Sequence, residues 1–103
     1  MLLKLLRSFL QPGPARLNRR ALDYRQQGDL RSAERVLREA AGRFSRDATT
    51  AVNLALVLLE QNRADTGAAE LERALALEPE NGAAHYNLAN LLRNAGQIGR
   101  AHV

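Results

Sequence analysis

The sequence predicts an all-α fold in which antiparallel helix pairs stack into a solenoid, preceded by a short amphipathic helix. The main observation is a pattern that recurs, without insertion, at a constant interval of about 34 residues. Its clearest aligned positions are Ala21, Ala55 and Ala89, then Tyr24, Leu58 and Leu92, then Gly28, Asn62 and Gly96. A fixed period of this size is typical of repeat proteins, in which each unit buries its apolar side against the next.

Composition supports helices that pack closely. The chain is 46% hydrophobic but only 4% aromatic, so we expect a core of leucine and alanine, and alanine permits short distances between helix axes. The absence of cysteine excludes disulfides and thiolate metal sites, and the histidines lack acidic company, so we expect no metal and no cofactor. The longest apolar run is far below the roughly 20 residues of a membrane span, and no secretory leader is recognisable. A cytoplasmic location is therefore expected.

The charge of +4 is unevenly distributed along the chain. Through Arg46 there are eleven Lys/Arg against four Asp/Glu, a balance of +7, and from Asp47 onward four against seven, a balance of −3. One interpretation is solvated helix surface, and the other is a basic end that meets an acidic peptide, a lipid headgroup or nucleic acid. Because no aromatic residues interleave the cations, we expect no specific nucleic-acid partner.

Residues 1–13 are predicted to form an amphipathic helix followed by a Pro/Gly linker. Leucines 2, 3, 5, 6 and 10 and Phe9 recur at helical spacing around Lys4 and Arg7, and Pro12-Gly13-Pro14 ends the helix. Two roles are open. The helix could cover the exposed side of the first repeat, or it could act as a weak interfacial membrane anchor through Met1–Leu10.

After the linker the pattern is helix, tight turn, helix. We expect helices over about 15–27, 30–44, 48–61 and 64–77, and a fifth that follows Asn81 and ends at Gly96. Asp29, Asp47 and Asn81 are predicted N-caps. Gly28 and Asn62 are expected at turns because each tolerates left-handed backbone geometry.

The aligned positions of these repeats resemble those of the tetratricopeptide repeat family. Residues 84–92, Ala-His-Tyr-Asn-Leu-Ala-Asn-Leu-Leu, are similar to its first-helix pattern, and residues 77–81, Leu-Glu-Pro-Glu-Asn, to its repeat junction. The resemblance implies a right-handed α-solenoid with repeats at 14–47 (degenerate), 48–81 and 82–103 (partial). Gly67 departs from the family pattern, which places alanine there, and Ser45 departs where proline is expected.

The third repeat lacks its second helix, so we expect the chain to be a fragment of a longer protein. Codons that encode residues 98–103 can match the start of a widely used sequencing adaptor. We therefore expect the native sequence to end near Gly96, the alternative being a natural short C-terminus. Self-association through the incomplete third repeat is a further expectation.

In this family the first helices of successive repeats line a concave groove that takes an extended peptide or a partner helix. Carried over by position, the resemblance implies a groove lined by Arg19, Arg25, Thr49, Val52, Asn53, Leu56, Tyr86, Asn87, Asn90 and Arg93, with Asn18, Leu22, Leu59 and Ala83 beside them. Asn53 and Asn87 occupy equivalent positions, and carboxamides there can hydrogen-bond the main chain of a ligand.

The expected function is that of a protein–protein interaction scaffold without catalysis of its own. The sequence contains no phosphate-binding loop, no Ser/His/Asp set and no spaced ligand cluster. The alternative is the N-terminal repeat region of a larger bacterial transferase, a glycosyltransferase or sulfotransferase, whose catalytic domain is absent from this sequence.

Overall fold

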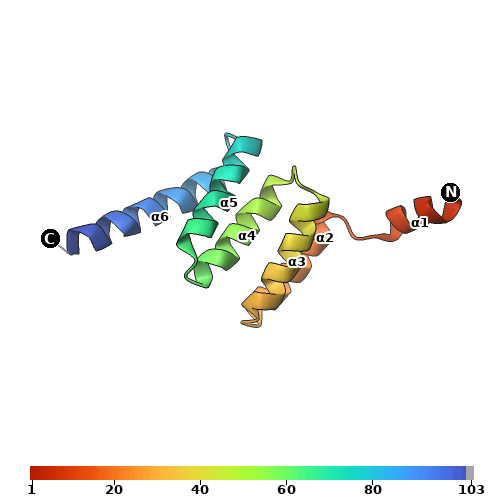
Figure 1. The fold of residues 1–103 in the computed structure, drawn as a ribbon, viewed down its shortest axis with the longest axis horizontal. Helices are drawn as coiled ribbons and strands as arrows, with labels where there is room; N and C mark the ends of the chain where they lie inside the picture. The colour runs from red at the N-terminus through yellow and green to blue at the C-terminus, as the bar shows by residue number, and fades with distance from the viewer. Residues whose placement is uncertain (102–103) are drawn as a thin grey trace.

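A computed structural model describes the backbone of residues 1–101 and the side chains of residues 1–7 and 10–96. Over residues 1–101 the chain is entirely helices and short connections (Figure 1). The helices are α1 (Leu2–Leu10), α2 (Pro14–Gln26), α3 (Leu30–Arg43), α4 (Ala48–Glu60), α5 (Ala64–Leu77) and α6 (Gly82–Ala101). The predicted all-α solenoid is confirmed.

The helix starts follow local capping chemistry. The carboxylates of Asp29 and Asp47 accept hydrogen bonds from the backbone N–H groups of Ser32 at 3.1 Å and Thr50 at 3.0 Å, and Asn81 Oδ1 accepts from Ala84 N at 2.9 Å. Each cap satisfies one of the N–H groups that a helix N-terminus leaves unpaired. Hydrogen bonds from the side chain and backbone of Ser32 also lower the pKa of Asp29. The three predicted N-caps are therefore confirmed.

The two complete turns use left-handed backbone geometry. Gly28 has φ 81° and Asn62 has φ 62°, as the repeat pattern predicts. Glycine lacks the Cβ that disfavours this conformation, and asparagine is one of the few other residues that adopt it. Each turn therefore reverses the chain between the helices of a pair, α2 with α3 and α4 with α5.

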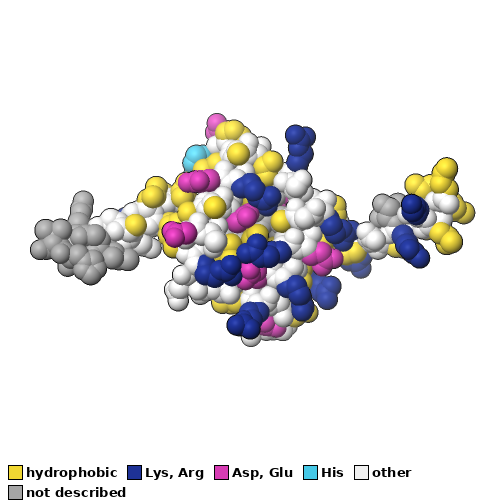
Figure 2. Space-filling view, viewed as in Figure 1, with side chains coloured by type: hydrophobic (Ala, Val, Ile, Leu, Met, Phe, Trp, Pro, Cys, Tyr) yellow, Lys and Arg dark blue, Asp and Glu magenta, His cyan; other side chains and the backbone are white. Residues whose placement is uncertain are grey.

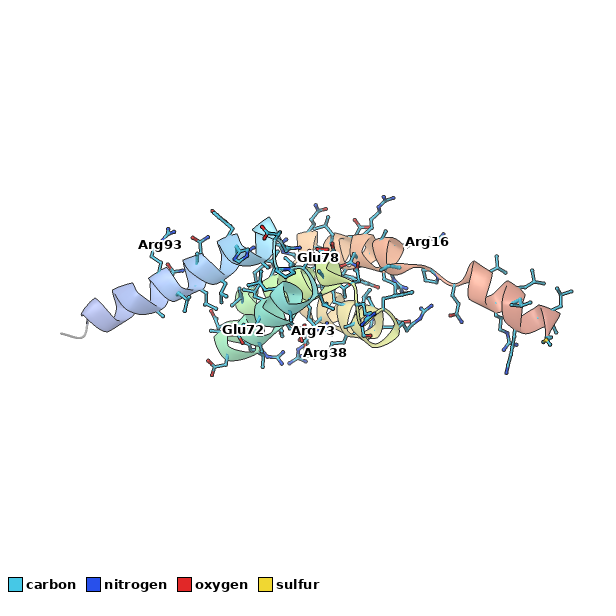
Figure 3. The ribbon with its side chains drawn as sticks, turned by 90° about the horizontal axis from the view of Figure 1, so that it is seen from above. Arg16, Arg38, Glu72, Arg73, Glu78 and Arg93 are labelled. Carbon is cyan, nitrogen blue, oxygen red and sulfur yellow. The ribbon has the colours of Figure 1, made fainter. Side chains whose placement is uncertain are left out.

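The helix pairs pack into two layers. Figure 3 shows α2, α4 and α6 along one side and α3 and α5 along the other, with labelled Arg16 and Arg93 on the first side. One core cluster lies between the first pair and α4, and it comprises Leu17, Ala21, Ala33, Val36, Leu37, Ala40, Leu54, Val57 and Leu58. A second lies among α4, α5 and the start of α6, and it comprises Ala48, Ala51, Val52, Ala55, Leu71, Ala74 and Ala84. These leucine and alanine clusters supply the burial that holds the stack together.

At Gly67 the second pair is packed more tightly than an alanine would allow. A Cβ added there would lie 2.8 Å from Leu59 Cδ2 and 2.9 Å from Leu59 Cγ. Carbon atoms normally approach to about 3.5–4.0 Å, so Leu59 occupies the volume that the missing methyl group leaves. The departure from the family pattern at this position therefore has a packing reason.

A polar cluster joins α3 to the turn between α4 and α5. The Glu34 carboxylate accepts hydrogen bonds from Arg38 at 2.7 Å, Arg63 at 2.8 Å and Gln61 at 3.1 Å. Burial acts to raise the pKa of Glu34, but these three donors outweigh it and hold the pKa below its ordinary value. The cluster ties α3 of the first repeat to the turn of the second.

The expectation that α1 covers the first repeat is wrong. α1 extends away from the stack (Figure 1), and its leucines face solvent, with Leu3 75% and Leu10 73% exposed. The linker is instead held at one point, where Arg43 Nη2 donates to Gln11 Oε1 at 2.8 Å. The proline and glycine of the linker direct the chain outward, so the apolar side of α1 does not reach the core.

The expectation that the last helix ends at Gly96 is also wrong. α6 continues to Ala101 as one helix, and Gly96 lies within it. Ala89 is exposed and Leu92 is 64% exposed, whereas Ala21 and Ala55 at the equivalent position of the earlier repeats are buried. A turn at Gly96 would be stabilised by a following helix packed against α6. No described helix packs on this side of α6. His102 and Val103 lie outside the described residues.

Candidate protein-binding groove

A groove runs between α2 and α4 on the side of the first helices. It forms a shallow hollow of about 20 Å³, enough for about one water molecule, lined by Asn18, Ala21, Leu22 and Arg25 from α2, Asn53, Leu56 and Val57 from α4, and Leu37 from α3. Its floor is apolar because Ala21, Leu37 and Val57 belong to the first core cluster. Leu22 is 45% exposed and Leu56 is half-buried, so the groove presents leucine side chains to solvent.

A chain of hydrogen bonds crosses the groove from α2 to α4. Asn18 Nδ2 donates to Thr50 Oγ1 at 2.8 Å and to the Pro14 carbonyl at 2.7 Å. Asn53 Nδ2 in turn donates to Asn18 Oδ1 at 2.7 Å, and Thr50 Oγ1 donates to Asp47 at 2.5 Å. Asn18 is 8% exposed and Thr50 is fully buried, so their polar atoms are partnered within the protein as burial requires.

The far end of the groove carries an ion pair. Arg25 Nε donates to Glu60 Oε1 at 2.6 Å, and Arg25 Nη2 also contacts this oxygen. Both side chains are about one-third exposed, so water screens the pair and it contributes little to stability. The positive charge of Arg25 is therefore largely balanced by Glu60 at the edge of the groove.

A second, wider hollow continues on the same side next to α6. It measures about 330 Å³ and is lined by Leu59, Asn62, Ala64, Asn87, Asn90, Leu91 and Asn94. Four of these seven residues are asparagines, and three of them lie on α6. Asn87 Nδ2 donates to the Ala83 carbonyl within its own helix at 2.8 Å. Carboxamides both donate and accept, so this surface suits a ligand with main-chain or other amide groups.

Five of the ten sequence-predicted groove residues line these two hollows. Arg25, Asn53 and Leu56 meet in the first, and Asn87 and Asn90 meet in the second. Tyr86 is 67% exposed on α6, and Thr49 and Arg93 are exposed on α4 and α6.

Two of the remaining five predicted positions have other surroundings. Val52 is only 5% exposed and packs in the second core cluster, which also contains Ala84 of α6. Arg19 lies with Arg16 and Arg20 around a separate hollow next to Pro12. Neither side chain lines the groove between α2 and α4.

Sequence reasoning missed three contributors. Thr50 joins α4 to Asn18, Glu60 pairs with Arg25, and Asn94 extends the asparagine surface of α6. Glu60 was detectable in principle, since it stands one repeat and one residue after Arg25 with opposite charge. Thr50 gave no signal of its own, because it looks like an ordinary residue of a first helical turn.

The part of the chain that the structure describes contains no group of three or more His, Cys, Asp or Glu side chains arranged to hold a metal ion. No described helix is both long enough and apolar enough to cross a membrane. The two hollows are lined mainly by leucine, alanine and asparagine side chains, and the first also contains the Arg25–Glu60 ion pair at its end.

Two family models, both described as tetratricopeptide repeat, match most of the chain, one over residues 18–68 and the other over residues 70–103. The chain belongs to the tetratricopeptide repeat family. Proteins of this family are in general non-catalytic scaffolds for protein interactions, so a protein partner is indicated in general terms. A comparison with curated proteins finds no match.

Proposed function

We propose that this tetratricopeptide repeat protein binds a peptide or a partner helix in the groove between α2 and α4. The observation that carries the proposal is the combination of solvent-facing leucine and amide groups over an apolar floor. Leu22 and Leu56 can bury apolar side chains of a ligand. Asn53 lines the same hollow and donates a hydrogen bond to Asn18. Apolar anchors beside a few placed polar groups are typical of peptide-binding sites.

Asn53 can take part in both the fold and the ligand contact. Its hydrogen bond to Asn18 uses one of its two N–H groups and none of its carbonyl oxygen's capacity. The second N–H and the oxygen are available, within the described residues, to a main-chain amide of a ligand. Because Asn18 holds the Asn53 side chain in place, less conformational entropy is lost when a ligand binds.

The asparagines of α6 extend the same surface. Asn87 and Asn90 border the second hollow, and exposed Tyr86 stands next to Asn87 on the same helix. A ligand that runs from the first hollow to the second meets apolar groups first and amides afterwards. We infer that its leucine-facing residues are apolar and that its remaining contacts depend on main-chain groups.

A displayed library of short linear peptides, selected on the full chain, tests this proposal. A peptide that binds is synthesised, and its Kd is measured by calorimetry for the wild type and for Leu22→Glu. A leucine buried in a binding site contributes enough free energy that its loss should weaken binding by about tenfold or more. Leu22 is exposed before binding, so this substitution should leave the fold intact.

The matched control is Ala76→Glu, which adds the same charge to an exposed position of α5 on the opposite layer. We expect its Kd to remain close to that of the wild type, and circular dichroism checks that both variants stay helical. Equal weakening in the two variants, or no weakening in Leu22→Glu, would contradict the assignment of binding to this groove.

A second hypothesis is that the same surface presents a substrate to a transferase domain, as in repeat-bearing glycosyltransferases or sulfotransferases. Sequencing of the source DNA across codons 90–110 tests it. A reading frame that continues into a nucleotide-sugar or phosphosulfate site supports the hypothesis, and one that stops after Val103 contradicts it.

A further inference from the structure

The leucines of α1 are exposed to solvent, because this helix packs against neither core cluster. Leu2 is 71% exposed, Leu3 75%, Leu5 65% and Leu10 73%, whereas Leu17, the first leucine of the stack, is 2% exposed. Contiguous exposed leucines of this kind mark an interaction surface more often than a chance arrangement. Figure 2 shows this apolar group over α1, at one extremity of the molecule.

The apolar side chains of α1 form one continuous side of the helix. Leu2, Leu6 and Leu10 follow one another at intervals of four residues, which places them in a row along the helix, with Leu3 and Leu5 flanking it. Lys4 and Arg7 lie toward the other side, and α1 contains no acidic residue. The helix therefore has an apolar side bordered by positive charge alone.

More positive charge lies where the linker joins the stack. Arg16, Arg19 and Arg20 surround one hollow next to Pro12, in which Asp23 is the single acidic residue. All three arginines are exposed, and none of them pairs with a carboxylate among the described side chains. The hydrogen bond from Arg43 to Gln11 joins the start of the linker to the end of α3, and only the short Pro/Gly linker separates α1 from this basic surface in the sequence.

We propose that α1 and the basic surface of α2 together bind an anionic lipid bilayer. The leucines of α1 enter the boundary between headgroups and acyl chains, with the helix parallel to the membrane. Lys4, Arg7 and the arginines of α2 contact headgroup phosphates and carboxylates. A short amphipathic helix binds a bilayer only weakly alone, and stable attachment generally needs a second signal, which the arginines supply.

The observations favour lipid over a second copy of this chain. A second copy could offer exposed Asp65, Glu72, Glu78 and Glu80 to these cations, so the choice between the two occupants depends on the shape of the apolar surface and not on charge. No described helix packs beside the leucine row of α1. A row exposed in this way fits a flat lipid surface better than the concave surface of a second copy. Membrane attachment of this kind goes beyond partner binding in the groove, because the two surfaces share no residue.

The test is co-sedimentation of the full chain with two kinds of vesicle, one of phosphatidylcholine and one of phosphatidylcholine mixed with phosphatidylglycerol. We expect binding to the mixed vesicles, weakening as salt is added, and much less binding to phosphatidylcholine alone. Leu6→Ser/Leu10→Ser should lower the partition coefficient by at least about tenfold, since two buried leucines are lost. Arg16→Gln/Arg20→Gln should lower it by about thirtyfold on mixed vesicles, since each cation near such a surface counts for about fivefold.

The matched control is Leu92→Ser, which removes a similarly exposed leucine from α6 and should leave vesicle binding unchanged. Absence of wild-type binding, or equal binding by wild type and Leu6→Ser/Leu10→Ser, overturns the proposal. Sedimentation velocity without vesicles tests whether α1 instead binds a second copy of this chain. A wild-type dimer that becomes monomeric in Leu6→Ser/Leu10→Ser, with no partition of either protein onto vesicles, assigns α1 to an interface between copies and likewise overturns it.

Discussion

Replacement of Gly67 by alanine tests the close contact between α4 and α5. Alanine in a helix interior is favoured over glycine by about 0.8–1 kcal/mol, so propensity alone predicts stabilisation. The new Cβ, however, would lie 2.8 Å from Leu59 Cδ2 and 3.4 Å from the Ala55 carbonyl oxygen. Leu59 would have to move by about 0.7 Å to restore normal contact, and overpacking of this kind costs about 1–3 kcal/mol. We expect Gly67→Ala to lower the free energy of unfolding by about 0–2 kcal/mol.

A double-mutant cycle with Leu59 isolates the contact between the two positions. In a Leu59→Ala background the atoms that oppose the new methyl group are gone, so Gly67→Ala should stabilise by about 1 kcal/mol. The coupling between the two positions should therefore be about 1–3 kcal/mol. Urea unfolding of the four proteins, followed by far-UV circular dichroism, measures it.

Gly42→Ala provides the matched control. Gly42 lies in α3, and a Cβ added there would have no atom within 4 Å, so only helix propensity acts at this position. This change should stabilise by up to about 1 kcal/mol, less if the last turn of α3 frays. If Gly67→Ala stabilises the wild type as much as Gly42→Ala does, with no coupling to Leu59, the close-packing argument is refuted.

Three further predictions concern the polar contacts and the first turn. Asn18→Ala should destabilise by about 1–3 kcal/mol in urea, because it removes the donor to buried Thr50 and to the Pro14 carbonyl; a loss no larger than that of an exposed position would contradict it. Gly28→Ala should cost about 1–2 kcal/mol, because a Cβ disfavours its φ of 81°; an unchanged unfolding midpoint would show that the turn relaxes. For Glu34, whose folded pKa is lowered, the stabilisation is complete above the unfolded pKa of about 4.3 and is lost as pH falls through the folded pKa. The stability gap between wild type and Glu34→Gln, measured by urea unfolding across this range, should therefore narrow as pH falls, and a constant gap would contradict the assignment.

The features that the sequence predicted best are those decided within a few residues. Asp29, Asp47 and Asn81 cap their helices as expected, and Gly28 and Asn62 adopt the left-handed turns. Each depends on one side chain and the backbone next to it. The 34-residue interval, about the length of one repeat, then identified which helices pair.

The features that it predicted badly depend on what lies opposite in space. Asn18, Val52 and Tyr86 occupy the same position of successive repeats, yet two are buried and Tyr86 is 67% exposed. Val52 packs in the second core cluster with residues of α4, α5 and α6, and Asn18 is tolerated in the interior because Thr50 accepts its N–H across 32 residues of sequence. Gly96 likewise resembles Gly28 in the sequence but lies within α6, because no described helix packs beyond it.

The uneven charge of the sequence acquires a physical meaning when ion pairs are considered. From the last turn of α2 onward, several arginines are paired with carboxylates. Arg25 with Glu60 and Arg63 with Glu34 join different elements, whereas Arg38 with Glu34 and Arg73 with Glu70 are pairs within one helix. The cations before that point, Lys4, Arg7, Arg16, Arg19 and Arg20, have no such partner among the described side chains. Arginines in the first group are largely neutralised where they stand, so they add little long-range attraction. Arg31, Arg35, Arg46 and Arg93 likewise have no carboxylate partner among the described side chains. These unpaired cations together produce the field that a negatively charged surface would encounter, and Lys4 and Arg7 bring part of it to the helix with the exposed leucine row.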